Sequence, residues 1–191
     1  MHKTPFYKRF TGSIFLAICL LQSASYAYAA KDWAEIRTKA EQGDAKSQLS
    51  LASRYQDGDG VVQNYKESVA WSRKAAEQGD AEGQYNLGYS YSSGKGVAKD
   101  EKQAFAWFSK AAEQGESAAQ AYLGIMYSAG IGVKKDKSLA YVWSAVAVAN
   151  GFDAATNSRN DFAALLSQPE LDAAQELAGL YFEKFPKPVV K

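Results

Sequence analysis

The sequence predicts an all-α protein, an α/α solenoid of stacked helical hairpins that ends in a C-terminal helical cap. The first observation is a 36-residue repeat, in which the string AEQG occurs at 40–43, 76–79 and 112–115. Aligning 40–75 with 76–111 gives 17 identities in 36. Within each unit, apolar residues recur at three- and four-residue steps, which is the spacing of one helix face. A repeat of this length indicates a solenoid, because a single hairpin cannot bury its apolar stripe without a neighbour.

The first 29 residues have the layout of a secretory signal peptide. They begin with three basic residues and no acid, continue with an apolar core at 14–21, and end in the small-residue motif AYA at 27–29. Cleavage after Ala29 would leave a net charge of −2 and no Cys or His, since Cys19 and His2 both precede that point. The sequence therefore predicts a periplasmic or secreted protein with no stable membrane anchor after cleavage. An uncleaved anchor is the alternative.

After a helix at 30–39, three repeats are expected within 40–151, at 40–75, 76–111 and 112–147. In the second unit, Asp80 is placed as the N-cap of a first helix, which ends where Gly94 supplies a positive-φ turn. Asp100 then begins the second helix, and Gly115 closes it. Gly88 and Gly124 take the position of Ala52, and such small residues let the paired helix approach closely.

The third repeat differs from the others in its second helix, where valines replace the charged surface of the earlier copies. A helix that is apolar nearly all round must be covered. Two segments at 152–185 are expected to form this cap, Ala154–Ser167 and Glu170–Phe185, followed by a tail at 186–191. The second segment has one apolar face, made of Leu171, Ala174, Leu177, Ala178, Tyr181 and Phe182.

These units resemble the SEL-one-like repeat (SLR) family, a branch of the tetratricopeptide-like repeat superfamily. The match covers about 40–151 and rests on recurring positions of the second unit: Gln84, Leu87, Gly88, Tyr91, Gly94, Gly96, Val97, Asp100, Ala104, Trp107 and Lys110-Ala111-Ala112. The resemblance implies a protein-protein interaction scaffold, with roles in envelope regulation, cell-wall maintenance or host contact among exported members. A cysteine-rich branch is linked with penicillin binding, but the mature chain lacks its cysteines, so that activity is not carried over.

No catalytic, metal or cofactor site is expected from the residues, although several short patterns resemble those of such sites. Ser92-Ser93-Gly94-Lys95 matches the S-x-x-K string of serine β-lactamases, but the partner elements S-D-N and K-T-G are absent. A cell-wall enzyme or a penicillin-binding or β-lactamase-like protein is therefore the alternative function. Asp57-Gly58-Asp59-Gly60 resembles a calcium loop, yet the later ligand positions are not acidic.

The tryptophans that recur every 36 residues, Trp71, Trp107 and Trp143, are interpreted as core positions rather than a sugar-stacking ladder. The near-equal numbers of acidic and basic residues, 21 and 22, do not favour nucleic-acid binding.

The remaining candidate is a protein-binding site on the concave face, which the first helices of such solenoids line. Leu49, Tyr85, Tyr89 and Ile125 project onto this face and would form an amphipathic patch. Tyrosine is a favoured anchor because it combines a rigid apolar ring with a polar tip. The expected partner is another envelope or secreted protein. Two alternatives stay open: the tyrosines only pad neighbouring helices, or the chain is a purely structural or multimeric module.

Overall fold

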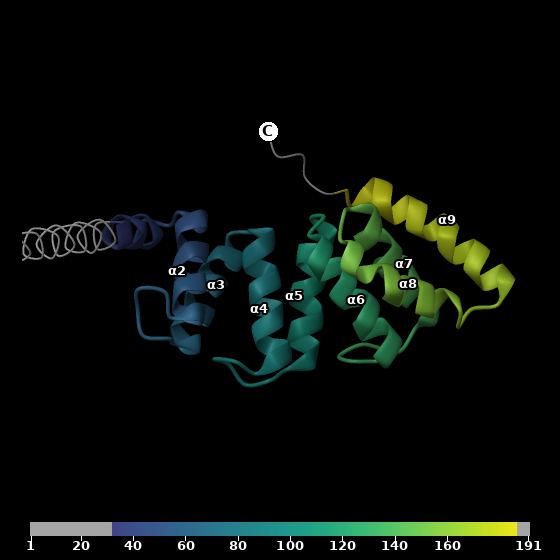
Figure 1. Cartoon of the computed structure of the whole chain (residues 1–191), viewed down its shortest axis with the longest axis horizontal. Helices are drawn as coiled ribbons and strands as arrows, with labels where there is room; N and C mark the ends of the chain where they lie inside the picture. Colours follow the sequence, from purple (N-terminus) through teal and green to yellow (C-terminus); the bar gives the residue numbers. More distant parts are fainter. Residues whose placement is uncertain (1–31, 187–191) are drawn as a thin grey trace, which may run out of the picture.

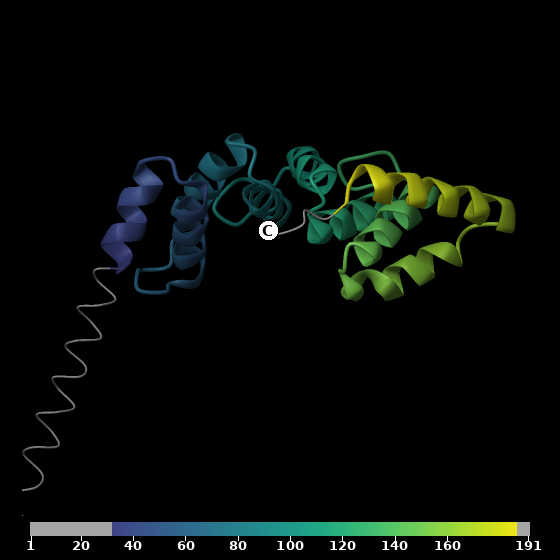
Figure 2. The same cartoon turned by 90° about the horizontal axis from the view of Figure 1, so that it is seen from above.

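The computed structural model describes residues 32–186, and within this range every regular element is a helix (Figure 1). The predicted signal peptide and the last five residues lie outside it. A helix at 32–41 comes first. The remaining helices are α2 (Ala45–Asp57), α3 (Tyr65–Glu77), α4 (Ala81–Ser93), α5 (Glu101–Glu113), α6 (Ser117–Ala129), α7 (Lys137–Ala149), the 3₁₀ turn η2 (Asp153–Ala155), α8 (Thr156–Ala163) and α9 (Gln168–Lys184). Figures 1 and 2 show successive hairpins placed side by side along one axis, which confirms the predicted solenoid.

The helices begin at the predicted capping residues. The side chain of Asp80 accepts a hydrogen bond from the backbone N–H of Gly83 at 2.8 Å. Asp100 accepts from the N–H groups of Lys102 and Gln103, each at 3.0 Å. These bonds satisfy backbone donors that have no partner inside the helix. The recurring caps therefore define where each hairpin starts.

The glycine-rich loops join each unit to the one before it. Gly94 ends α4 with a φ of 73°, and Gly132 adopts a φ of 68° in the next loop. A side chain at Gly132 would collide with the carbonyl oxygen of Glu101, at the start of α5. Only glycine combines this positive φ with so close a backbone approach. The loop of the third unit is thereby fixed against the second.

Close packing inside the hairpins depends on the predicted small residues. A Cβ built at Gly88 would lie 2.9 Å from the ring of Phe108, and one at Gly124 would collide with the Ser144 hydroxyl. Gly179, in α9, has open space around the same position. The glycines at 88 and 124 are thus required by the neighbouring helix, as predicted, whereas Gly179 is not.

Two alanine substitutions are expected to have opposite effects on stability. Gly124→Ala should lower the free energy of unfolding by about 1–3 kcal/mol, because the added methyl overpacks the α6–α7 contact. Gly179→Ala should raise it by about 0.5–1 kcal/mol, since alanine is the better helix former and meets no neighbour. Urea unfolding followed by circular dichroism measures both. Equal effects of the two changes would contradict the packing described for Gly124.

A ladder of hydrogen-bonded amide side chains, in which buried Gln residues meet amides nearer the surface, runs through the stacked units. Gln84 donates to the carbonyl of Ala76 at 3.4 Å and accepts from Gln114 at 2.7 Å. Gln48 and Gln120 repeat the arrangement one unit earlier and later. We call this set the amide ladder; its members are Gln48, Gln78, Gln84, Gln114, Gln120 and Asn150. It explains why Gln recurs every 36 residues at buried positions.

The C-terminal helices cover α7, as its apolar surface predicts. Val142 and Val146 are fully buried and pack in one cluster with Ala174 and Ala178 of α9. One predicted member of the covered face is wrong, because Phe182 is 40% exposed. The α9 residues that pack on the cluster are Leu171, Ala174, Leu177, Ala178 and Tyr181, and Phe182 lies outside this set. In its place, Phe185 packs against the core.

The helix at 32–41 closes the other end of the solenoid. Arg54 of α2 forms an ion pair with Asp32. Trp33 meets Tyr55 edge to face, with ring centroids 6.4 Å apart. The lone N-terminal helix of the prediction therefore packs on α2 and covers the first hairpin.

Candidate protein-binding face

The candidate site lies on the first helices α2, α4 and α6, and we call the surface to which Leu49, Tyr85, Tyr89 and Ile125 belong the first-helix face. The 36-residue period aligns Leu49 of α2 with Tyr85 of α4, and aligns Tyr89 of α4 with Ile125 of α6. Leu49 is only 9% exposed, Tyr85 and Tyr89 are half-buried, and Ile125 is 45% exposed. The four predicted residues thus differ in how much surface they offer.

Tyr85 and Tyr89 meet in an aromatic cluster between α4 and α6. Both rings contact Tyr122, with centroid distances of 5.9 Å for Tyr85 and 6.3 Å for Tyr89. Tyr122 stacks in turn on the buried ring of Phe108 at 4.8 Å. Tyr85 therefore packs the repeat interface while one part of it stays at the surface. Both interpretations of the tyrosines, padding and binding surface, are compatible with this arrangement.

The phenol of Tyr85 is held in its neutral form by this environment. Burial, with a smaller contribution from Tyr122, raises the pKa of Tyr85 to about 12. Burial also raises the pKa of Tyr122. A phenol that resists ionisation can donate a hydrogen bond over the whole physiological pH range. The cluster thus offers apolar ring faces together with neutral polar tips.

Tyr85 should make the stability of the fold fall in alkaline solution. A tyrosine in the unfolded chain ionises near pH 10, whereas folded Tyr85 keeps its proton to about pH 12. The stability that Tyr85 contributes is therefore complete below pH 10 and is lost as the pH rises toward 12. Tyr85→Phe should reduce the fall in unfolding free energy between pH 9.5 and pH 11.5. Identical pH slopes for the two proteins in urea unfolding would contradict the raised pKa.

Between α2 and α4 the same face is hollowed and polar. One opening of about 570 Å³ is lined by residues that include Lys46, Ser53 and Glu82. A smaller pocket of about 130 Å³ adjoins it and shares Leu49, Ser53 and Glu82 with the opening. Leu49 is therefore a pocket wall rather than an exposed patch residue. The aromatic cluster and the hollow lie side by side along α4.

The structure brings together Tyr85 and Tyr89 but separates Leu49 and Ile125, which lie on the flanking helices α2 and α6. Sequence reasoning missed Tyr122 and Phe108 as members of the cluster, and Asn86 as part of the hollow. The signal for Tyr122 was available, because it is one unit away from Asn86 and is the only aromatic residue at that position of the repeat. Which helices meet at that position follows only from the stacking.

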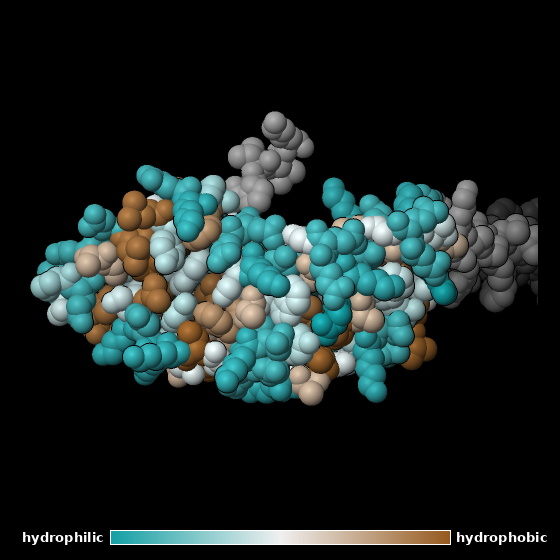
Figure 3. All heavy atoms as spheres, turned by 180° about the vertical axis from the view of Figure 1, so that it is seen from behind, coloured by the Kyte–Doolittle hydropathy of each residue, from teal (hydrophilic) through white to brown (hydrophobic). Residues whose placement is uncertain are grey.

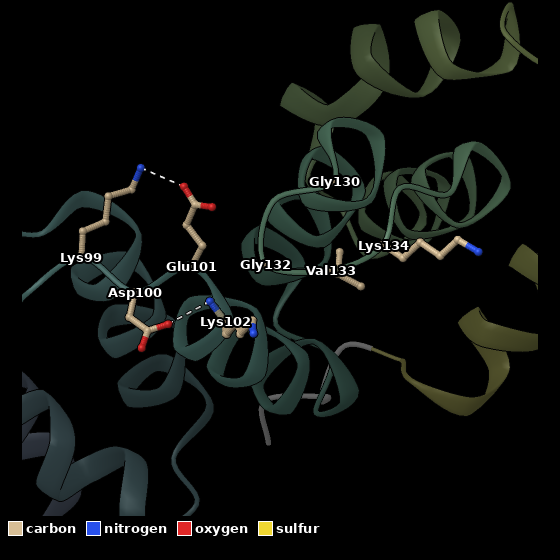
Figure 4. Close-up of a pocket in the computed structure, with 8 residues that line it drawn as sticks. All are labelled: Lys99, Asp100, Glu101, Lys102, Gly130, Gly132, Val133 and Lys134. Atoms are coloured by element: carbon tan, nitrogen blue, oxygen red, sulfur yellow. Dashed lines mark hydrogen bonds and ion pairs between the residues drawn. The ribbon is translucent and has the colours of Figure 1, made fainter.

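A further pocket, of about 730 Å³, lies away from this face (Figure 4). The start of α5 and the loop of the third unit form it. Lys99 pairs with Glu101 at 3.0 Å, and Asp100 caps α5 through the Lys102 N–H. Its lining contains no Ser, Thr, Cys, His or Tyr that could act as a nucleophile beside a base. The pocket is an open seam between two repeats.

Several residues of the catalytic and metal patterns take part in local structure in the described part of the chain, although the side chain of Ser92, the serine of the S-x-x-K string, forms no hydrogen bond there. The Ser93 hydroxyl donates to the Tyr89 carbonyl at 2.9 Å, and the ammonium of Lys95 lies 5.4 Å from the ring centroid of Tyr65. In the calcium-like loop, Gly58 ends α2 with a φ of 77°. Across residues 32–186, no cluster of three or more Asp, Glu, His or Cys is arranged to hold a metal ion.

The repeated tryptophans are packing residues with unequal burial. Trp143 is 6% exposed and lies against Tyr181 and Phe185, at 5.2 and 5.8 Å. Trp107 is half-buried and packs against the cluster of Val69, Ala76 and Leu87, which spans the first and second units. Trp71 is half-buried as well, beneath the ammonium of Lys74 at 3.8 Å. The core interpretation fits Trp143 best, because α9 covers it.

Surface hydrophobicity is concentrated over the C-terminal helices, as the left end of Figure 3 shows. Leu165, Leu180 and Phe182 are the large exposed apolar residues there. Among residues 32–186, the helices are too short or too polar to cross a membrane.

Comparison with known proteins finds a family profile that matches the repeats. The Sel1 repeat profile matches three consecutive segments, 45–80, 81–116 and 117–152. These segments keep the 36-residue period and begin five residues later than the units used above. A search of curated proteins finds no match.

Two solved structures are similar to the chain. One is a protective antigen present in uropathogenic Escherichia coli strains, which displays an SLR fold. It is 33% identical over 85% of this chain, with a TM-score of 0.63, and this chain spans 45% of its length. The other is a Sel1 repeat protein from Oxalobacter formigenes, 41% identical over 69% of this chain and 98% of its own, also with a TM-score of 0.63. With three matched repeats over more than half of its length, the chain belongs to the Sel1 repeat family.

Proposed function

We propose that this protein is an exported, non-enzymatic scaffold whose first-helix face holds a segment of another envelope or secreted protein. The observation that carries the proposal is the aromatic cluster of Tyr85, Tyr89 and Tyr122, half-buried along one face of two adjacent repeats. Ile125, on the adjoining helix α6, adds an exposed apolar side chain to the same face. Rings that are held by their neighbours lose little entropy on binding, which favours them as anchors.

Three further observations support a scaffold. The pocket beside α5 has no Ser, Thr, Cys, His or Tyr in its lining, and within the S-x-x-K string the Ser93 hydroxyl and the Lys95 ammonium take part in local contacts. The hollow beside the cluster adds polar groups to an apolar surface, as in many interaction interfaces. The antigen similar to this chain carries the same fold. The export part of the proposal rests on the signal-peptide layout of the first 29 residues.

Charged substitutions on the exposed part of the face test the proposal. Tyr89→Asp and Ile125→Asp should each reduce capture of a partner from the native envelope by more than tenfold, because an anchor contact contributes about 2 kcal/mol or more. Ala106→Asp, on an exposed position of α5, is the matched control and should leave capture unchanged. Circular dichroism checks that all three proteins are folded. Equal capture by the face variants and the control would refute the assignment of the face.

A further inference from the structure

The hollow between α2 and α4 exists because the aromatic cluster is not repeated there. The positions of Tyr85, Phe108 and Tyr122 correspond, one unit earlier, to Leu49, Ser72 and Asn86. Two large rings are thus replaced by short polar side chains. The resulting pocket of about 130 Å³ lies where the next interface is filled by stacked rings.

The pocket is lined by polar groups that have no partner in the described part of the chain. Ser68 and Ser72 are buried, and neither hydroxyl makes a hydrogen bond within residues 32–186. The side-chain amides of Gln56 and Asn86 also lack a partner in this range. Solvent reaches the Ser68 and Ser72 hydroxyls through the pocket, and Gln56 is exposed at its rim, so the hydrogen-bonding capacity of these groups is available to a polar guest.

A carboxylate gives the pocket its charge. Glu82 lines both the pocket and the wider opening beside it. Partial burial, followed by the nearby Asp80 and Glu116, raises the pKa of Glu82, so a cation placed beside it would relieve an unfavourable environment. The basic residues of the opening, Lys46 and Arg54, do not neutralise Glu82 in the described structure. Arg54 pairs with Asp32, and no ion pair joins Lys46 to Glu82.

We propose that this pocket binds a lysine side chain of the segment held on the first-helix face. This proposal rests on the proposed function, and it adds which side chain of the partner segment the pocket would bind. The ammonium group would donate to the Glu82 carboxylate and to the hydroxyl and amide oxygens, while the methylene chain would pass Leu49 and Ala52. The volume equals about four water molecules, which suits one unbranched side chain and is too small for a sugar ring with its hydroxyls.

Small probes test the pocket without the natural partner. N-acetyl-lysine N-methylamide is titrated into the purified, isotope-labelled protein, and amide NMR shifts are followed at Ser68, Ser72 and Asn86. Saturable shifts at these residues are expected. N-acetyl-norleucine N-methylamide, which has no ammonium group, should produce none. Absence of shifts with the lysine probe, or the same response to norleucine or to methyl glucoside, would overturn the proposal.

Two variants locate the binding. Glu82→Gln should weaken the lysine probe by about tenfold, the effect expected for losing a charged hydrogen bond. The double variant Ser72→Phe and Asn86→Tyr copies the rings of the next interface and should abolish the shifts by filling the pocket. Glu113→Gln, an exposed carboxylate of α5, is the control and should bind like the parent protein. Unchanged affinity in Glu82→Gln counts against the proposal even where the double variant fails to fold.

The two proposals can fail separately. Partner capture that depends on Tyr89 and Ile125, without any response to the lysine probe, would leave the scaffold in place and reject the lysine pocket. A response to the lysine probe without partner capture would support the lysine pocket and reject the scaffold proposal.

Discussion

Replacing Gln120 with Leu is expected to lower the free energy of unfolding by about 3–5 kcal/mol. Gln120 is fully buried and donates to the carbonyls of Ala112 at 3.0 Å and of Phe185 at 3.3 Å. It also accepts from the Asn150 amide at 2.9 Å. Leucine fills similar space but leaves these partners with fewer hydrogen bonds in a buried place. Each group left unsatisfied costs about 1–3 kcal/mol.

The matched comparison is Gln48→Leu at the other end of the amide ladder. Gln48 bonds only to the Ala40 carbonyl and the Gln78 amide, and no C-terminal helix docks on it. Gln48→Leu should therefore lower the free energy of unfolding by less than Gln120→Leu does, the difference being about 1 kcal/mol or more. Urea unfolding of both variants measures the difference. A loss at Gln48 equal to that at Gln120 would show that the docking of Phe185 contributes nothing.

Replacing Gly132 with Ala is expected to cost about 3 kcal/mol and to loosen the contact between the second and third repeats. A left-handed backbone costs a residue with a Cβ about 1–2 kcal/mol. The added methyl would also collide with the Glu101 carbonyl, which belongs to the backbone and cannot turn aside. Overpacking of this kind adds about 1–3 kcal/mol.

Gly151→Ala separates these two costs. Gly151 has a φ of 89°, and a Cβ there meets nothing within 4 Å. This variant should lose only the backbone part, so the difference between the two variants isolates the contact with the neighbouring repeat. Thermal unfolding gives both values. Equal melting temperatures for the two variants would mean that the loop moves aside freely and does not join the units.

The repeat period made most of the fold predictable. The caps at Asp80 and Asp100, the turn at Gly94 and the small residues at 88 and 124 all lie where local rules put them. The caps and the turn depend on neighbours in sequence, the small residues depend on the paired helix of the same unit, and the 36-residue period supplies each of them more than once.

Features that depend on which units touch could not be predicted in this way. Trp71 and Trp143 occupy one repeat position, yet only Trp143 is covered, because α9 follows the last unit. Phe182 is exposed, whereas Phe185, the residue that follows α9, packs against the core, because the chain leaves the helix at that point. The period alone also does not predict that a hollow forms beside Ser72 and Asn86, whereas Phe108 and Tyr122 stack at the corresponding place of the next interface. Such differences arise between residues on separate helices, so they require the packed structure.

Position-resolved crosslinking in the native envelope tests the first-helix face most directly. A photo-reactive benzoylphenylalanine is placed singly at Tyr89, at Ile125 and at the control position Ala106, and the crosslinked products are identified by mass spectrometry. The same partner protein should be captured from positions 89 and 125, through one continuous segment of its chain, and not from 106. Capture that is equal at all three positions, or that occurs at 106 alone, would contradict the proposal that the first-helix face is the binding surface.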